Sequence, residues 1–291
     1  QVQAYVGNFG ISKNPESFAV YGRRKYFVDK DRNAVMRLSQ DGLTEISRYG
    51  IVNYFREQLN DIDIPTEEGK VIGGWDIYTK QYVLSLQKAQ SSEYQTLSFD
   101  EQVLGWPGTF TYEPAQIFSV KNRFYSVNYS GSLWQHNYEN PSNNNRGNFY
   151  GQYSPSNITF IFNPSVSMSK VFKTINYEGS AGWKIVALNA SRSFELNDTA
   201  SVILSYGEGA YTDGGVTYYE GFYKKEGKYF ANIVNDSQPT EGEVVFGNSI
   251  SGVKGYYSTV TIQTDALTKT GDGGVPRELF AVSSEYVESS Y

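Results

Sequence analysis

Short alternating segments separated by tight turns dominate this sequence. In KYFVDKDRNAVMRLSQDGLTEIS (25–47), three segments that alternate apolar and polar residues are separated by residues 30–33 and 40–42. Alternation with a period of two places every second side chain on the same face of a strand, and Asp-Gly supplies a tight hairpin turn. The pattern predicts an antiparallel meander of three strands.

Units of the same kind recur later in the chain. Residues 73–100 and 115–139 again read as strands joined by short turns. If Tyr26, Tyr82 and Phe124 occupy equivalent positions, the repeat is roughly 40–55 residues long, which is the length of a β-propeller blade. We therefore expect three blade-like units.

Two breaks in the strand pattern set the expected organisation. Residues 49–62 carry apolar side chains spaced for one face of a helix, so one short helix is expected there. Residues 137–157 are rich in Asn, Gly and Pro and interrupt the alternation. We place a domain boundary near their end, between residues 1–155 and residues 156–291.

The second part of the chain also reads as strands. Alternating or apolar segments run from ITFIFN to RELFAVSSEYV, separated by turns rich in Gly, Asn and Asp. This pattern is typical of a β-sandwich or a similar antiparallel module. The predicted fold class is therefore all-β, with partial β-propeller-like blades in residues 1–155 and an antiparallel β-sandwich-like module in residues 156–291.

Composition argues against several classes of function. Acidic residues outnumber basic ones, 31 to 25, for a net charge of −6, which argues against nucleic acid as a partner. The chain has no cysteine, so disulfides and thiolate chemistry are excluded, and no apolar run is long enough for a membrane-spanning helix. The first residue is not methionine, and we expect the chain to be processed or part of something longer.

Aromatic residues are abundant, with 25 Tyr, 17 Phe and 4 Trp. Aromatic side chains favour strands, so an ordinary all-β protein would contain many of them. Tyrosine also has a large apolar body and a polar tip, which suits a surface in contact with a partner. Both interpretations stay open at this point.

One triplet has the spacing of the first ligands of a calcium loop: Asp29, Asp31 and Asn33. Such a loop needs Gly at its sixth position and Glu at its twelfth, where this chain has Ala34 and Gln40. Asp and Asn also shape turns by bonding nearby backbone N–H groups. We therefore expect a hairpin corner without a metal ion.

No pattern of catalytic residues emerges. His136 is the only histidine, so a site with several histidine ligands is excluded, and we expect His136 to be a structural strand residue. The acidic residues show no spacing specific to glycoside hydrolysis. The glycine-rich residues 206–215 lack the Lys-Ser/Thr of a phosphate loop and are predicted as a loop tip. We expect no catalytic residues, no cofactor and no enzymatic activity.

The strand pattern also predicts a core and an ordered C-terminus. Residues expected to be mostly buried are Phe27, Val35, Leu38, Val83, Leu84, Phe124 and Trp134. The C-terminal RELFAVSSEYVESSY has apolar residues on both faces, which predicts a strand buried within a sheet over residues 278–284. After it, Tyr286, Val287 and Tyr291 are expected to dock on a neighbouring subunit.

Several stretches, spread over most of the chain, resemble a known family. They are NPESFAVYGRRKYFVDKDRNAVMRLSQDGLTEISRYGIVNYFRE (14–57), GGWDIYTKQYVLSL (73–86), TLSFDEQVLGW (96–106), RGNFYGQYSPSNITFIFN (146–163), SKVFKTINYEGS (169–180), KKEGKYFANI (224–233) and RELFAVSSEYVESSY (277–291). These stretches resemble large virion structural proteins of tailed bacteriophages, as found in marine T4-like cyanophages and crAss-like phages.

The resemblance implies a structural, non-enzymatic virion component that is propeller-like in part and is assembled in the host cytoplasm. Its partners would be copies of itself and other virion tail or neck proteins. The resemblance does not separate tail, neck and baseplate positions. Aromatic anchors at subunit contacts would hold such a component in place.

A binding function is the alternative from another class. A carbohydrate- or receptor-binding β module of a tail would use exposed aromatic rings as stacking platforms for a host surface glycan. The candidate residues are Trp75, Trp106, Trp134 and Trp183. This alternative requires that at least two of these indoles line one exposed groove.

Overall fold

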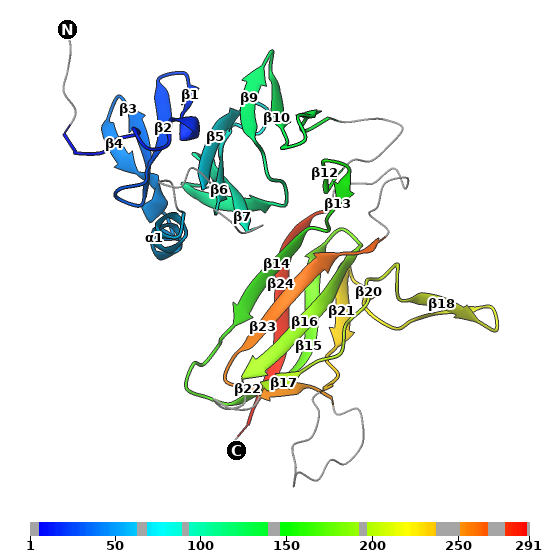
Figure 1. Cartoon of the computed structure of the whole chain (residues 1–291). Coiled ribbons are helices and arrows are strands. Elements are labelled where there is room, and N and C mark those ends of the chain that lie inside the picture. The colour runs from blue at the N-terminus through cyan, green and yellow to red at the C-terminus, as the bar shows by residue number, and fades with distance from the viewer. Residues whose placement is uncertain are drawn as a thin grey trace. The chain divides into compact units, whose positions relative to one another are not determined.

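The computed structural model describes residues 6–62, 69–88, 93–138, 146–191, 197–236, 251–266 and 277–289. The chain divides into two compact units, whose elements are labelled in Figure 1. Unit 1 comprises Gln1–Glu139 and Phe149–Gln152, and unit 2 comprises Asn140–Asn148 and Tyr153–Tyr291. The segment Phe149–Gln152 thus belongs to unit 1 although the chain has already entered unit 2.

Unit 1 begins with a four-stranded antiparallel meander. Its strands, in order across the sheet, are β1 (Ala19–Tyr21), β2 (Arg24–Asp29), β3 (Ala34–Ser39) and β4 (Gly42–Glu45). The last three are the strands that the alternation in residues 25–47 predicts. The sequence prediction is confirmed for this meander, and β1 extends it by one strand.

Two further antiparallel sheets and a small hairpin follow in the chain. The first sheet contains β5 (Lys70–Asp76), β6 (Gln81–Gln87), β7 (Tyr94–Asp100) and β8 (Gly105–Phe110) in that order. The second contains β9 (Gln116–Val120), β10 (Arg123–Val127) and β11 (Leu133–Gln135), with β10 in the middle. The hairpin pairs β12 (Asn148–Phe149) with β13 (Gln152–Tyr153).

The described residues contain one α-helix, α1 (Val52–Asn60). It lies within the predicted range 49–62, and its residues Phe55 and Leu59, one turn apart, are both buried in the core of unit 1. Two short 3-10 helices are η1 (Pro15–Ser17) and η2 (Ile46–Arg48). In the described part of the chain, no helix is long and apolar enough to cross a membrane.

A stack of aromatic rings lies at the centre of unit 1. The ring of Tyr26 is 5.3 Å from the ring of Trp75 and 5.0 Å from that of Tyr82, and is nearly parallel to both. The Tyr82 hydroxyl donates a hydrogen bond of 2.6 Å to the carbonyl oxygen of Ser17. A Cβ at Gly73 would lie 2.2 Å from the same oxygen. β5 therefore needs glycine there, because η1 approaches the sheet so closely.

The predicted core of unit 1 is correct in part. The structure buries four of the seven residues, Val35, Val83, Leu84 and Phe124. Phe27, Leu38 and Trp134 are only partly buried, so their assignment to the core is corrected. On β2 the buried side chains are Tyr26 and Val28, which alternate with Phe27. Alternation identifies two faces of a strand, but it does not tell which face is buried when both carry apolar residues.

Unit 2 contains two larger antiparallel sheets and a separate hairpin. The first sheet contains β14 (Asn157–Phe162), β23 (Ser258–Thr264), β16 (Trp183–Ser191) and β17 (Asn197–Thr199) in that order. The second contains β20 (Tyr223–Lys225), β21 (Lys228–Asn232), β15 (Lys170–Gly179), β22 (Val253–Gly255) and β24 (Leu279–Glu288). The hairpin pairs β18 (Ala210–Asp213) with β19 (Val216–Tyr219).

Both sheets of unit 2 contribute to one buried cluster. Phe172, Ile175 and Tyr177 come from β15, whereas Ile185, Val260 and Ile262 come from the sheet that contains β16 and β23. All strand pairs among the described residues are antiparallel. The prediction of an all-β, antiparallel protein is therefore confirmed.

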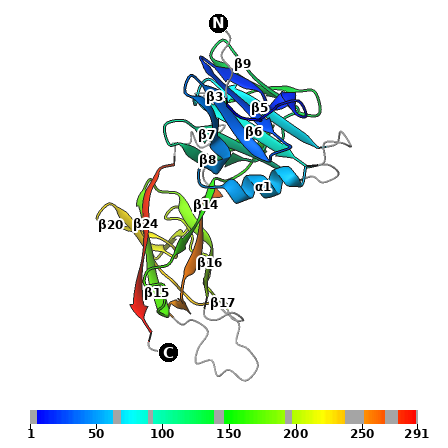
Figure 2. The ribbon, with the colours of Figure 1, turned by 90° about the vertical axis from the view of Figure 1, so that its left-hand side faces the viewer.

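The C-terminal segment is a strand, but its predicted burial is wrong. β24 pairs with β15 alone, and Figure 2 shows it along one side of unit 2. Leu279 and Val282 pack against the core, whereas Phe280 is 73% exposed. β24 is therefore an edge strand whose apolar residues lie partly against the core and partly exposed. Residues 285–288 contribute backbone pairing with β15, so they are part of the sheet and not only a surface for a partner.

The face assignment on β2 can be tested by two substitutions. We expect Tyr26→Ala to lower the free energy of unfolding by about 3–5 kcal/mol, since it removes a buried aromatic ring from a stack. Phe27→Ala should cost less than half as much, because its ring is only partly buried. Denaturant unfolding measures both values. Equal losses for the two variants would contradict the assignment.

Candidate functional site

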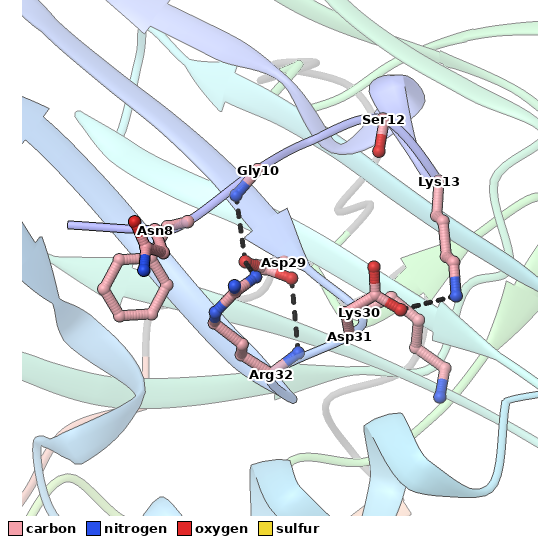
Figure 3. Close-up of a pocket in the computed structure, with 9 residues that line it drawn as sticks. Asn8, Gly10, Ser12, Lys13, Asp29, Lys30, Asp31 and Arg32 are labelled. Atoms are coloured by element: carbon pink, nitrogen blue, oxygen red, sulfur yellow. Dashed lines mark hydrogen bonds and ion pairs between the residues drawn. The ribbon is translucent and has the colours of Figure 1, made fainter.

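The hairpin corner at Asp29, Asp31 and Asn33 lies beside a small pocket of about 130 Å³. Residues 8–10, 12–13 and 29–32 line it, and Figure 3 shows their side chains. The lining combines cationic and anionic groups, so the pocket has no single strong charge. Such a mixture is a poor match for a bare divalent cation.

The carboxylates of this pocket are already engaged. Asp29 accepts hydrogen bonds from the backbone N–H groups of Gly10 and Arg32, at 2.9 and 3.2 Å, and from the Arg32 guanidinium at 3.0 Å. Asp31 pairs with Lys13, whose hydrogen bond lowers the pKa of the Asp31 carboxyl. Asn33 has φ 50°, the left-handed conformation that Asn adopts in turns. These contacts fit a hairpin corner.

Addition of calcium tests this interpretation. We expect no change in melting temperature with calcium, because a cation would have to displace the Arg32 and Lys13 contacts. Asp29→Asn should lower the free energy of unfolding by about 1–3 kcal/mol in calcium-free buffer, since the buried carboxylate loses charge-assisted hydrogen bonds. Asp31→Asn, at an exposed position, is the control and should cost little. A calcium-dependent rise in melting temperature that Asp29→Asn abolishes would contradict the assignment.

His136 belongs to a buried chain of hydrogen bonds. Its Nε2 lies 2.6 Å from the hydroxyl oxygen of Ser126, which lies 2.7 Å from the hydroxyl oxygen of Tyr150. Ser126 is fully buried, and the ring of His136 packs against Tyr112 and Phe124. Because Ser126 is buried, its hydroxyl is not accessible to a substrate as an exposed nucleophile would be. The arrangement instead ties segment 149–152 to β10 and β11.

The His136 environment makes a prediction about pH. Burial lowers the pKa of His136 from 6.5 to about 4, because it penalises the charged imidazolium. The unfolded chain then binds a proton at higher pH than the folded chain does. Titration of His136 therefore leaves stability unchanged above pH 6.5 and lowers it by about 3 kcal/mol as the pH falls from 6.5 toward 4.

Comparison with a His136→Gln variant measures this contribution. The free energy of unfolding is measured at several pH values between 7 and 4 for both chains. We expect the natural chain to lose more stability than the variant over this interval. Parallel pH profiles would show that His136 does not titrate as its burial implies.

The four tryptophans do not gather on one exposed surface. Trp75 and Trp183 are buried, in the cores of unit 1 and unit 2 respectively. Trp106 packs against the unit 1 core and donates to the carbonyl oxygen of Ile46 at 3.1 Å. Trp134 is partly buried, with its ring 5.5 Å from that of Tyr150. The indoles serve mainly as packing groups.

The C-terminal candidates are partly accessible. Val287 is 57% exposed, whereas Tyr286 is partly buried and its ring lies 6.2 Å from that of Phe172. Tyr291 lies outside the described residues. Of the two described residues, Val287 has the side chain that is more open to a partner.

An exposed aromatic hairpin was missed by the sequence analysis, which predicts a loop tip at residues 206–215. β18 and β19 are joined by Gly214 and Gly215, with φ 55° and 82°, as in a tight type I′ turn. Tyr211 and Tyr218, directly paired on the two strands, stack 5.5 Å apart and are 52% and 45% exposed. Asp-Gly-Gly between two alternating segments is the signal that could have identified it.

The hairpin is anchored at its base and free at its tip. The Tyr206 and Tyr219 rings stack 4.5 Å apart, and their hydroxyl oxygens lie 2.8 Å apart. Tyr206 in turn contacts Tyr229 of β21. In Figure 1 the hairpin extends away from the two sheets of unit 2 on the side of β20. The hairpin and the edge strand β24 both expose aromatic or apolar side chains on unit 2.

Comparison with known proteins agrees with a virion origin. The family model described as "Crassvirus muzzle protein C-terminal domain" matches residues 144–236, which include β14 to β21. The muzzle protein of Bacteroides phage crAss001 is 24% identical over 201 residues, which cover 67% of this chain. The chain spans 13% of that relative's length. These similarities support a structural protein of a crAss-like phage.

Proposed function

We propose that this chain is a non-enzymatic structural component of a tailed-phage virion, in the tail, neck or baseplate region. The observation that carries the proposal is the similarity to a muzzle protein over 67% of the chain. The proposed fold remains partly propeller-like in unit 1 and sandwich-like in unit 2. Its partners would be copies of itself and other tail or neck proteins, met after synthesis in the host cytoplasm.

The described surface supports a role in contacts between subunits. Unit 2 exposes Tyr211 and Tyr218 on a projecting hairpin, and Phe280 and Val287 on an edge strand. Exposed aromatic and apolar groups of this kind commonly mark protein contact sites, where buried aromatics supply much of the binding energy. The Ser126 hydroxyl, beside His136, is buried.

The positions of the tryptophans give little support to the glycan-binding alternative. It relied on stacking by the tryptophans, and Trp75 and Trp183 are 6% and 7% exposed. Trp106 is held by the unit 1 core. The exposed tyrosine pair of the hairpin could stack on a sugar or on another protein, and the muzzle similarity favours the protein contact.

The proposal predicts that the chain is present in purified virions of its phage. Peptides spanning both units should appear in the virion at a constant ratio to the major capsid protein, because a structural part has a fixed copy number. Quantitative mass spectrometry of gradient-purified particles measures this ratio, and antibody labelling would place the chain on the particle. Peptides found in infected cells but absent from virions would refute the proposal.

A further inference from the structure

The second sheet of unit 2 ends in two unlike edges. β24 and the pair β21 and β22 lie on opposite sides of β15, so the order across the sheet is β20, β21, β15 and β24. Among the described strands, none pairs with the outer side of β24 or of β20. Each edge therefore presents backbone groups that another strand could bond.

β24 lacks the usual protection of an edge strand. It has ten residues and contains no lysine, arginine or proline, the residues that commonly prevent edge-to-edge pairing. In its pairing with β15, β24 has one bulge of its own, at Phe280, the second residue of the strand. Phe280 and Val287 are 73% and 57% exposed. A long edge strand with exposed apolar residues and no lysine or proline is a site of strand addition.

Charge distinguishes the two edges. β24 contains Glu285 and Glu288, both exposed, and no basic residue. β20 contains Lys224 and Lys225, both exposed, and no acidic residue. Two β24 edges would bring like charges together, as would two β20 edges. β24 against β20 brings opposite charges together, so the pattern favours a head-to-tail contact.

The strand directions fit the same contact. Successive antiparallel pairs make β20 antiparallel to β24 within one chain. A second copy placed beside β24 in the same orientation would therefore add its β20 as an antiparallel strand. Cross-strand registers also place Lys225 and Glu285 on the same face of the sheet, so a register between the two copies that sets them opposite each other pairs their charges on one face of the continued sheet.

We propose that β24 of one copy pairs with β20 of a second copy, which continues the sheet from chain to chain. The projecting hairpin, next to β20 in sequence, would place Tyr211 and Tyr218 against the neighbouring copy. Because the two edges differ, the contact is heterologous and repeats around a ring or along a filament. This inference rests on the proposed structural role and names its partner surface.

Sedimentation velocity of the 291-residue chain tests the contact. We expect association that rises with concentration, and its loss in Phe280→Lys and Val287→Lys, since both side chains are exposed and a lysine on β24 would repel Lys224 and Lys225 of the neighbouring β20. Ile161→Lys is the matched control, because Ile161 is 62% exposed on β14 of the other sheet. It should associate like the natural chain. A chain that stays monomeric at its highest soluble concentration would overturn the inference, as would a loss confined to Ile161→Lys.

Charge reversal distinguishes the head-to-tail contact from a symmetric β24 pair. Lys225→Glu and Glu285→Lys should each weaken association by about tenfold, whereas the double variant should regain it. An equimolar mixture of the two single variants should also associate. A symmetric pair predicts instead that Lys225→Glu has no effect and that the double variant behaves like Glu285→Lys alone. That result would overturn the inference. Circular dichroism confirms that every variant is folded.

The proposed interface and the proposed function can be refuted independently of each other. If the chain is present in virions but stays monomeric in solution, the proposed interface is wrong and the proposed function still holds. Head-to-tail association of a chain that is absent from virions would support the interface and remove the proposed function.

Discussion

The buried aromatic stack of Tyr26, Trp75 and Tyr82 is the constraint on which unit 1 depends. Tyrosine can enter a core only if its hydroxyl keeps a hydrogen-bond partner. The Tyr26 hydroxyl donates to Glu101 at 2.6 Å, and Arg37 binds the other oxygen of the same carboxylate at 2.6 Å. Burial and the Glu101 contact raise the pKa of Tyr26, so the phenol stays neutral. This network fixes which face of β2 is inside.

Strand β15 has the corresponding role in unit 2. It is paired on one side with β21 and β22 and on the other with β24, and it supplies Phe172, Ile175 and Tyr177 to the core. The sheet ends at β24, because no other described strand pairs with that edge. The same pairing that orders the C-terminal segment therefore leaves Phe280 and Val287 open to another chain.

The polar groups that suggest chemistry in the sequence act within the fold. Asp29 holds a hairpin corner through Gly10 and Arg32. His136 and Ser126 lie within hydrogen-bond distance, as a catalytic pair would, yet Ser126 is fully buried. Exposed aromatic and apolar side chains lie on the hairpin and on β24. This distribution suits a protein whose work is contact with other proteins.

The sequence by itself determined the all-β class, the meander of residues 25–47 and the short helix, because these depend on local periodicity and turn residues. It also pointed to phage structural proteins. Only the tertiary structure decided that Tyr26 and not Phe27 is buried, since alternation marks two faces without ranking them. It likewise decided that β24 is an edge, paired with β15 more than a hundred residues earlier in the chain. Such features depend on which strands are neighbours, and pairing between residues far apart in the chain leaves no local signal.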